Sequence, residues 1–250
     1  MDYLDEHGLP VYISDVMSRI NEEKPQSIRG FMLDYFDAVS NGTNVLFRDF
    51  TYIKATPRNR ISFAAQLASI VNSNPKDSYK PADYFHMIEL ISTGFPVEIV
   101  QRASDVTEYL LGLRDPRNQS EPAVALPKKS FLSYFKICFY YTEFLDLTEK
   151  ILLSTSLDHF SHSKNSMASI ILNSTDLTNL KCLFRSQLQD QLTTYSPSVK
   201  IPTTQTIHFC TERTFSGNQL MASSIAQSAK LITFEFIRNL CLIEINFGPK

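Results

Sequence analysis

The chain has 250 residues, of which 43% are hydrophobic and 20% charged, and its formal net charge is −2. This composition is typical of a folded globular protein and argues against intrinsic disorder. Nucleic-acid binders usually carry a large positive excess, so the near-neutral charge gives no indication of nucleic-acid or acidic-lipid binding. The chain has only seven glycines, which argues against glycine-rich phosphate loops and many-turned β-barrels.

The cysteines and the apolar windows predict a cytoplasmic protein without a membrane span. No two cysteines have the two-residue spacing of a zinc or redox motif; they are Cys138, Cys182, Cys210 and Cys241. Residues 1–10 are acidic rather than apolar, so they do not read as a secretory signal. The most apolar window, residues 131–147, contains three charged residues, whereas a bilayer span needs about 20 residues nearly free of charge.

Five prolines mark expected helix starts, because proline is favoured in the first turn of a helix. Each precedes a stretch with apolar residues at helical spacing; they are Pro10, Pro25, Pro57, Pro81 and Pro96. Thr56 is expected to cap the helix at Pro57, and Asn41-Gly42 is a good stop for the helix after Pro25. The fold is therefore expected to be mostly α.

Four regions follow from this pattern. Residues 1–43 form a helical hairpin, 44–153 a helical core domain, 154–169 a serine-rich linker and 170–250 a C-terminal helical region. Within the core, 43–56 is either a short strand or an extended connector, 114–129 is a loop and 130–153 is one central helix. In the last region we expect a helix over 177–188, then one long helix or two over 220–245.

The helix pairs of the core domain are compatible with degenerate EF-hands. The loop between two of them, Asp115–Pro122, has prolines and an arginine where an EF-hand needs oxygen ligands and a central glycine. We therefore expect no calcium binding.

The sequence contains no recognisable catalytic motif, and we expect no catalytic residue, cofactor or metal. His159 and His162 are three residues apart and could share one face of a metal ion on a helix. They lie in the serine-rich segment with only Asp158 close by, so solvated linker histidines are the preferred interpretation. His86 and His208 stand beside phenylalanines and are interpreted as packed imidazoles. An unrecognised enzyme remains a third class of function.

The N-terminal hairpin has one apolar stripe on each helix, and these stripes predict a partner-binding surface. Its predicted members are Ile13, Val16, Met17, Ile20, Ile28, Met32, Tyr35 and Phe36. A hairpin of about 40 residues buries too little area to be stable alone. Either it pairs with a second copy or a partner, or its helices pack onto the rest of this chain.

Three segments of the hairpin resemble the dimerisation and docking module of type II protein kinase A regulatory subunits. They are Tyr3–Pro10, Glu23–Pro25 and Phe31–Phe36. The resemblance implies a four-helix bundle made by two chains, whose groove accepts an amphipathic helix from a scaffold protein.

A longer resemblance covers the chain from about Tyr3 to Leu147. Asp34–Val39, Gly42–Phe50, Ala55–Phe63 and Phe139–Leu145 are similar to the centriolar-satellite-associated tubulin polyglutamylase complex regulator family. After the serine-rich segment the resemblance is faint.

That family resemblance implies a non-catalytic adaptor or regulator. Its implied partners are subunits of the tubulin polyglutamylase complex, including a tubulin-tyrosine-ligase-like ligase, and microtubules indirectly. Its implied location is the cytoskeleton, at centrosomes, centriolar satellites and the basal bodies of cilia. The alternative is a dimeric docking scaffold of cilia or flagella that binds amphipathic helices and is unrelated to polyglutamylation.

Three arginines beside the best-matched block are also predicted to contact partners. Residues 1–50 carry nine acidic and four basic residues, whereas 51–80 carry five basic and one acidic, so the two segments differ in local field. We expect at least one of Arg48, Arg58 and Arg60 to fork onto a carboxylate of this chain, such as Asp49 or Glu143, and to hold the 43–56 connector. The others would face an acidic partner.

Overall fold

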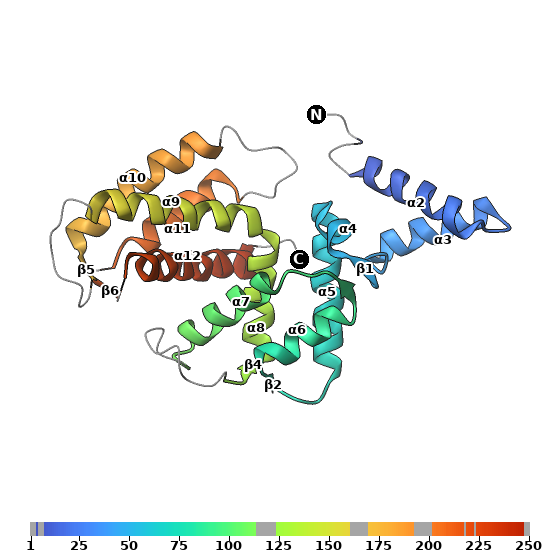
Figure 1. Ribbon diagram of the computed structural model, residues 1–250, viewed down its shortest axis with the longest axis horizontal. Coiled ribbons are helices and arrows are strands. Elements are labelled where there is room, and N and C mark those ends of the chain that lie inside the picture. Colours follow the sequence, from blue (N-terminus) through green and yellow to red (C-terminus); the bar gives the residue numbers. More distant parts are fainter. Residues whose placement is uncertain are drawn as a thin grey trace. The chain divides into compact units, whose positions relative to one another are not determined.

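The computed structural model describes residues 4, 8–113, 124–160, 170–192, 202–217, 219–222 and 224–247. Over these residues the protein is mostly α-helical with only short strands, which confirms the predicted fold class. The chain divides into two compact units (Figure 1). Unit 1 comprises Met1–Asp77 and Ala82–Val97, and unit 2 comprises Ser78–Pro81 and Glu98–Lys250.

Unit 1 begins with two consecutive helices, α2 (Leu9–Glu23) and α3 (Ile28–Asn41), which we call the hairpin. Three further helices follow, α4 (Phe50–Lys54), α5 (Pro57–Ser73) and α6 (Pro81–Glu89). Two short strands, β1 (Arg48–Asp49) and β3 (Ser92–Thr93), pair in parallel. The hairpin therefore connects to α5 through a compact connector.

The helix boundaries in unit 1 follow the capping chemistry that the sequence predicts, with one exception. The Thr56 hydroxyl accepts a hydrogen bond from the Asn59 N–H at 3.1 Å, and Pro57 is the first residue of α5. The helix after Pro25 starts later than expected, at Ile28, because Ser27 caps it by accepting from the Gly30 N–H. A side-chain cap satisfies a free backbone donor, which the proline cannot do.

The end of α3 depends on a glycine. Gly42 has a φ of +68° and caps the helix in the left-handed conformation, which is costly for any residue with a Cβ. A Cβ built there would lie 2.8 Å from the Ser62 Oγ of α5. Gly42 therefore both ends α3 and allows α5 to approach it closely.

The connector between α3 and α5 contains a short strand and a one-turn helix, and the helix was in neither of the predicted alternatives. The sequence did not decide between a short strand and an extended segment for residues 43–56. The structure has the two-residue strand β1 followed by the one-turn helix α4. The Asp49 carboxylate starts α4 by accepting from the Tyr52 N–H at 2.8 Å.

Unit 2 contains the remaining helices. They are α7 (Val97–Leu110), α8 (Lys128–Tyr140), α9 (Thr142–Phe160), α10 (Ser174–Leu192), α11 (Thr204–Thr214) and α12 (Ile225–Phe247). Two short antiparallel pairs accompany them, β2 (Ser78–Tyr79) with β4 (Leu126–Pro127), and β5 (Ile170–Asn173) with β6 (Gln219–Ala222). The helix α12 packs against α8, α9 and α11 and forms the centre of the unit (Figure 1).

The core of unit 2 is rich in aromatic side chains. Phe144 of α9 and Phe184 of α10 are both fully buried, and both contact Phe236 of α12. Phe131, Phe135 and Phe139 stack along one face of α8 at ring distances of 5.8 Å. Cys138, Cys210 and Cys241 are buried free cysteines, and burial raises the pKa of Cys138 to about 12.

Several sequence predictions for unit 2 differ from the structure. The predicted single helix over 130–153 is two helices, because the chain breaks at Tyr141 between α8 and α9. The second helix continues to Phe160, so the first part of the predicted 154–169 linker is helical. The segment 219–222 is a strand, and α12 begins only at Ile225. The predicted EF-hand-like loop, Asp115–Pro122, lies outside the described residues.

Within the described part of the chain, no helix has the length and apolarity required to span a bilayer. The predicted boundaries at residues 43, 153 and 169 stay predictions.

Candidate functional site

A polar network ties the hairpin to the connector and to α5. The Tyr12 hydroxyl of α2 lies 3.0 Å from the Thr56 hydroxyl and donates to the Asn59 Oδ1 at 2.9 Å. Asn59 is 1% exposed, and its amide also donates to the Tyr52 carbonyl at 2.9 Å. Buried polar groups are stable only when they are hydrogen-bonded, so these contacts fix α2 against the start of α5.

The same network continues to the other side of the hairpin. The Asn44 amide donates both to the Asn59 Oδ1 at 3.2 Å and to the Tyr52 hydroxyl at 2.8 Å. The Tyr52 hydroxyl lies 3.1 Å from that of Tyr35, which in turn donates to the Asp15 carboxylate at 2.7 Å. An unbroken chain of hydrogen bonds therefore runs from Thr56 to Asp15.

Arg48 ends this network with a clamp. Its guanidinium forks onto the Asp15 carboxylate through Nη1, at 3.0 Å from Oδ2, and through Nη2 on Oδ1. Its Cζ also lies 3.8 Å from the centroid of the Tyr52 ring. This contact confirms that one of the three arginines forks onto a carboxylate of the chain, although the acceptor is Asp15 rather than Asp49 or Glu143.

Burial of this network changes the acidity of its groups. Desolvation, together with the hydrogen bonds to Tyr52 and Asp15, raises the pKa of Tyr35. Desolvation also raises the pKa of Tyr12. Burial alone would lower the pKa of Arg48, but the Asp15 carboxylate outweighs it and the net shift is upward. Tyr12 and Tyr35 are therefore neutral and Arg48 is charged near neutral pH.

The predicted apolar surface of the hairpin divides into an inner and an outer part. Val16 and Tyr35 are buried inside unit 1, in one cluster with Tyr12 and Val39. Three predicted residues are half-buried against that cluster: Ile20, Met32 and Phe36. Three are strongly exposed: Ile13 at 50%, Met17 at 50% and Ile28 at 56%. The inner part thus packs α2 against α3 within the hairpin, and the outer part leaves apolar side chains exposed.

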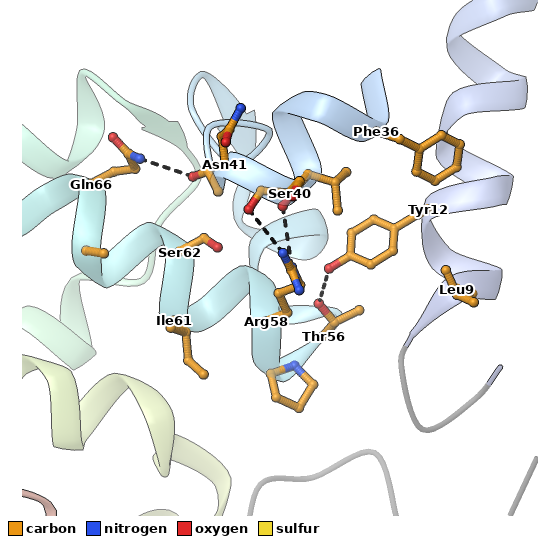
Figure 2. Close-up of a pocket in the computed structure, with 14 residues that line it drawn as sticks. Leu9, Tyr12, Phe36, Ser40, Asn41, Thr56, Arg58, Ile61, Ser62 and Gln66 are labelled. Atoms are coloured by element: carbon orange, nitrogen blue, oxygen red, sulfur yellow. Dashed lines mark hydrogen bonds between the residues drawn. The ribbon is translucent and has the colours of Figure 1, made fainter. Parts of the chain in front are cut away.

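A groove of about 770 Å³ opens beside the network (Figure 2). It is walled by one face of α5, the end of α3 and the start of α2. The residues that line it are Leu9, Tyr12, Phe36, Val39, Ser40, Asn41, Gly42, Thr56, Pro57, Arg58, Ile61, Ser62, Ala65 and Gln66. In Figure 2 the Tyr12, Phe36 and Leu9 side chains gather on one side and the α5 residues on the other.

The groove walls are fixed to each other by hydrogen bonds to the last carbonyls of α3. Arg58 donates to the Val39 and Ser40 carbonyls at 3.4 and 3.1 Å, and Gln66 donates to the Gly42 carbonyl at 3.2 Å. The negative end of the α3 dipole also stabilises a cation at this position. Arg58 is exposed, so it both caps α3 and reaches the groove.

The third predicted arginine is buried and joins two helices of unit 1. Arg60 is 6% exposed, and its Nε donates to the Lys54 carbonyl at 3.1 Å. It therefore holds the end of α4 to α5. The structure brings Arg48 and Tyr35 into the network, Arg58 and Phe36 into the groove, and leaves Ile13 and Met17 outside both.

Six residues of the network were missing from the predicted site: Tyr12, Asp15, Asn44, Tyr52, Thr56 and Asn59. Tyr12 directly precedes Ile13 in the apolar stripe of α2. A tyrosine there could have been expected to face inward and to need a hydrogen-bond partner for its hydroxyl. Asn59 lies three residues after the Thr56 cap on the buried face of α5, where an amide needs a partner. The sequence holds no comparable signal for Asp15.

No set of three metal-ligating side chains gathers among the residues that the structure describes. His86 is exposed, and the His208 Nδ1 lies 2.8 Å from an Arg185 guanidinium nitrogen. His162 lies outside the described residues, and the side chain of His159 is not described.

The chain has curated homologues, each named "Centriolar satellite-associated tubulin polyglutamylase complex regulator 1". The human protein is 29% identical, that of Mus musculus 30% and that of Danio rerio 31%, each over 157 residues. The match covers 58% of this chain and 43% of each of these relatives, so the chain spans less than half of their length.

No protein-family profile matches the chain. No solved structure matches it either.

Proposed function

We propose that this protein is a non-catalytic adaptor that regulates a tubulin polyglutamylase complex at centriolar satellites. The observation that carries the proposal is its homology to proteins named as regulators of that complex. Its partners would be subunits of the complex, including a tubulin-tyrosine-ligase-like ligase, and its effect would be on assembly of the complex and glutamate addition to microtubules.

The site geometry supports unit 1 as the binding part. The segments that resemble the regulator family, 34–39, 42–50 and 55–63, form the end of α3, the connector and the start of α5. These are the elements that build the polar network and two walls of the groove. A conformation fixed by so many directional contacts presents a rigid surface to a partner, which lowers the entropic cost of binding.

Affinity purification of the full chain from ciliated cells tests the proposal. We expect recovery of the ligase and its companion subunits, and a changed level of polyglutamylated tubulin when the gene is deleted. A preparation that lacks every polyglutamylase subunit, with the protein folded and expressed, would contradict the proposal. Imaging should place the tagged chain at centriolar satellites and basal bodies.

A second function is favoured by the exposed apolar residues of the hairpin. Ile13, Met17 and Ile28 are each about half exposed, as expected for an interface that a second copy covers. In this alternative the protein is a dimeric scaffold of cilia or flagella. Sedimentation equilibrium of the full chain should then show a dimer that Met17→Glu dissociates, and purification should recover axonemal anchoring proteins instead of the ligase.

A further inference from the structure

A hollow of about 280 Å³ lies between α8 and α12 in unit 2. Its walls include Lys129, Ser130 and Tyr134 of α8 and Arg238 and Leu242 of α12. The charged residues that line it are Lys129 and Arg238, so each helix contributes a cation and neither contributes an acid. Two cations on opposite walls of one hollow attract an anion between them.

Both cations have hydrogen-bonding capacity left for a ligand. Lys129 is exposed and forms no ion pair with a described residue. The Arg238 Nη1 donates to the Glu235 carboxylate of the same helix at 3.2 Å, but a guanidinium has several further N–H donors. Its side chain is 55% exposed. A second carboxylate can therefore bind Arg238 without displacing Glu235.

The other walls of the hollow suit an anion on a short aliphatic stem. No described hydrogen bond involves the hydroxyl of Ser130 or Tyr134, so both are available as donors. Burial raises the pKa of Tyr134, and its phenol therefore keeps its proton near neutral pH. The Tyr134 ring and Leu242 supply apolar surface, which methylene groups can cover.

The positive charge extends beyond the hollow along α8. Lys136 is exposed and lies seven residues after Lys129, on the same face of the helix and about 10 Å further along its axis. It contacts the Tyr140 ring and forms no ion pair with a described residue. The first turn of α8 contains no acidic residue, so the helix dipole adds to the positive field there. We call the hollow together with Lys136 the α8 surface.

We propose that the α8 surface binds a glutamate-rich acidic peptide. One glutamate carboxylate lies between Lys129 and Arg238, with its methylene groups on Leu242 and Tyr134. A second glutamate, about three residues further along an extended chain, reaches Lys136. The choice of glutamate rests on the proposed function, because a polyglutamylase makes chains of this residue; the α8 surface itself requires only repeated carboxylates.

Two labelled peptides test this on the full-length protein, hexaglutamate and hexaglutamine. Fluorescence anisotropy measures the affinity of each at physiological salt. We expect hexaglutamate to bind at least about tenfold more tightly, because several exposed ion pairs form only with the charged peptide. The preference should shrink as sodium chloride is added. Inorganic phosphate should displace hexaglutamate no better than sodium chloride of the same ionic strength, because one small anion cannot contact both the hollow and Lys136.

Charge-reversal variants locate the binding site. Lys129→Glu should weaken hexaglutamate binding about tenfold, because an attraction becomes a repulsion, and Lys136→Glu about threefold, because it lies outside the hollow. Lys150→Glu, at an exposed position of α9 that does not line the hollow, makes the same change in net charge. This matched control should bind hexaglutamate as the parent does.

Loss of the fold is an improbable cause of weaker binding by Lys129→Glu, since an acidic residue in the first turn of a helix is favourable to the dipole. Circular dichroism checks that each variant is folded.

Equal affinity for the two peptides overturns the proposal, and so does equal weakening by Lys129→Glu and Lys150→Glu, which would show attraction by net charge alone. Displacement by phosphate at matched ionic strength also overturns it, because the hollow would then be a site for a single small oxyanion. The proposed function is judged separately. A parent chain that binds hexaglutamate but recovers no polyglutamylase subunit contradicts the adaptor role alone, and one that recovers the subunits but binds no hexaglutamate contradicts the α8 surface alone.

Discussion

The hairpin with its connector, residues 8–60, and the core of unit 2 are stabilised in different ways. In the first region, polar side chains bridge separate elements, as Tyr12 does from α2 to α5 and Arg48 from the connector to α2. In unit 2, buried hydroxyls bond to their own helix: Ser104 donates to the Val100 carbonyl and Thr148 to that of Phe144. Between the helices of unit 2, buried aromatic rings contact one another, as Phe144 and Phe236 do, and ion pairs such as Arg102–Asp146 and Lys181–Glu212 lie partly in solvent.

This difference predicts two kinds of sensitivity to mutation. Hydrogen bonds are directional, so a network that bridges elements specifies one relative placement and is disrupted by the loss of one atom. Aromatic packing is less directional, and its contribution scales with the volume removed. Four substitutions, in order of decreasing expected effect, test this comparison.

The largest effect is expected for Phe144→Ala in the core of unit 2. Phe144 is fully buried and its ring lies 5.9 Å from that of Phe236. The substitution should lower the free energy of unfolding by about 3–5 kcal/mol, from lost transfer energy and the cavity left behind. Urea unfolding followed by circular dichroism measures it.

Phe209→Ala is the matched control for the core, because Phe209 of α11 is 43% exposed. It should lower the free energy of unfolding by less than about 1 kcal/mol. Similar losses for the two phenylalanines would contradict the packing assigned to unit 2.

Removal of the Arg48 clamp should have the next largest effect. Asp15→Ala leaves a half-buried guanidinium without its carboxylate and should cost about 2–3 kcal/mol. With Arg48→Met it forms a double-mutant cycle, whose coupling energy should be about 1–3 kcal/mol. The pair Arg19–Glu23, exposed on α2, is the control, with an expected coupling of about 0.3–0.5 kcal/mol. Equal coupling in the two pairs would show that the clamp does not stabilise the hairpin.

Tyr12→Phe removes a single hydroxyl from the network and should have a smaller effect. The Thr56 hydroxyl loses its contact with Tyr12, and the Asn59 Oδ1 keeps only the Asn44 amide. We expect a loss of about 1–2 kcal/mol. Tyr134→Phe in unit 2 should be close to neutral, since no described hydrogen bond involves that hydroxyl. A neutral Tyr12→Phe would refute the bridging role of the network.

The smallest effect is expected for an exposed ion pair of unit 2, and it should depend on pH. The Glu212 carboxylate accepts from the Lys181 amine at 3.1 Å, and this contact lowers the pKa of Glu212 below its ordinary 4.5. A depressed pKa contributes stability above pH 4.5, and this contribution is lost as the pH falls through the folded-state value. Glu212→Gln should therefore lower the urea midpoint slightly at pH 7.

At pH 3 the two proteins should converge, because protonation approaches the neutral state that the glutamine imitates. A difference that is the same at pH 7 and pH 3 would mean that the charge of Glu212 is not its cause.

Local chemistry accounts for the parts of the fold that the sequence predicts well. Thr56 and Gly42 mark the start of α5 and the end of α3 because each satisfies backbone groups within a few residues. The four apolar residues chosen for the helix over 177–188 are all buried in α10: Leu177, Leu180, Phe184 and Leu188. Apolar periodicity therefore identifies both the helix and its inner face.

Contacts between distant residues account for the parts that it does not predict. A carboxylate partner for Arg48 could be expected, but Asp15 lies 33 residues earlier, and nothing in the sequence pattern distinguishes it from other acidic residues. The break between α8 and α9 falls in a continuous apolar run, where periodicity gives no boundary. The groove depends on how α2, α3 and α5 pack, which no single-segment pattern contains.

The Arg48 clamp also means that the hairpin should change shape little when a partner binds to it. Asp15 and Tyr52 hold the guanidinium from two sides, so the walls made by α2 and α3 are fixed before any encounter. The ordering entropy of association then falls on the incoming segment. Stiffening the hairpin further should therefore leave the affinity for a partner almost unchanged.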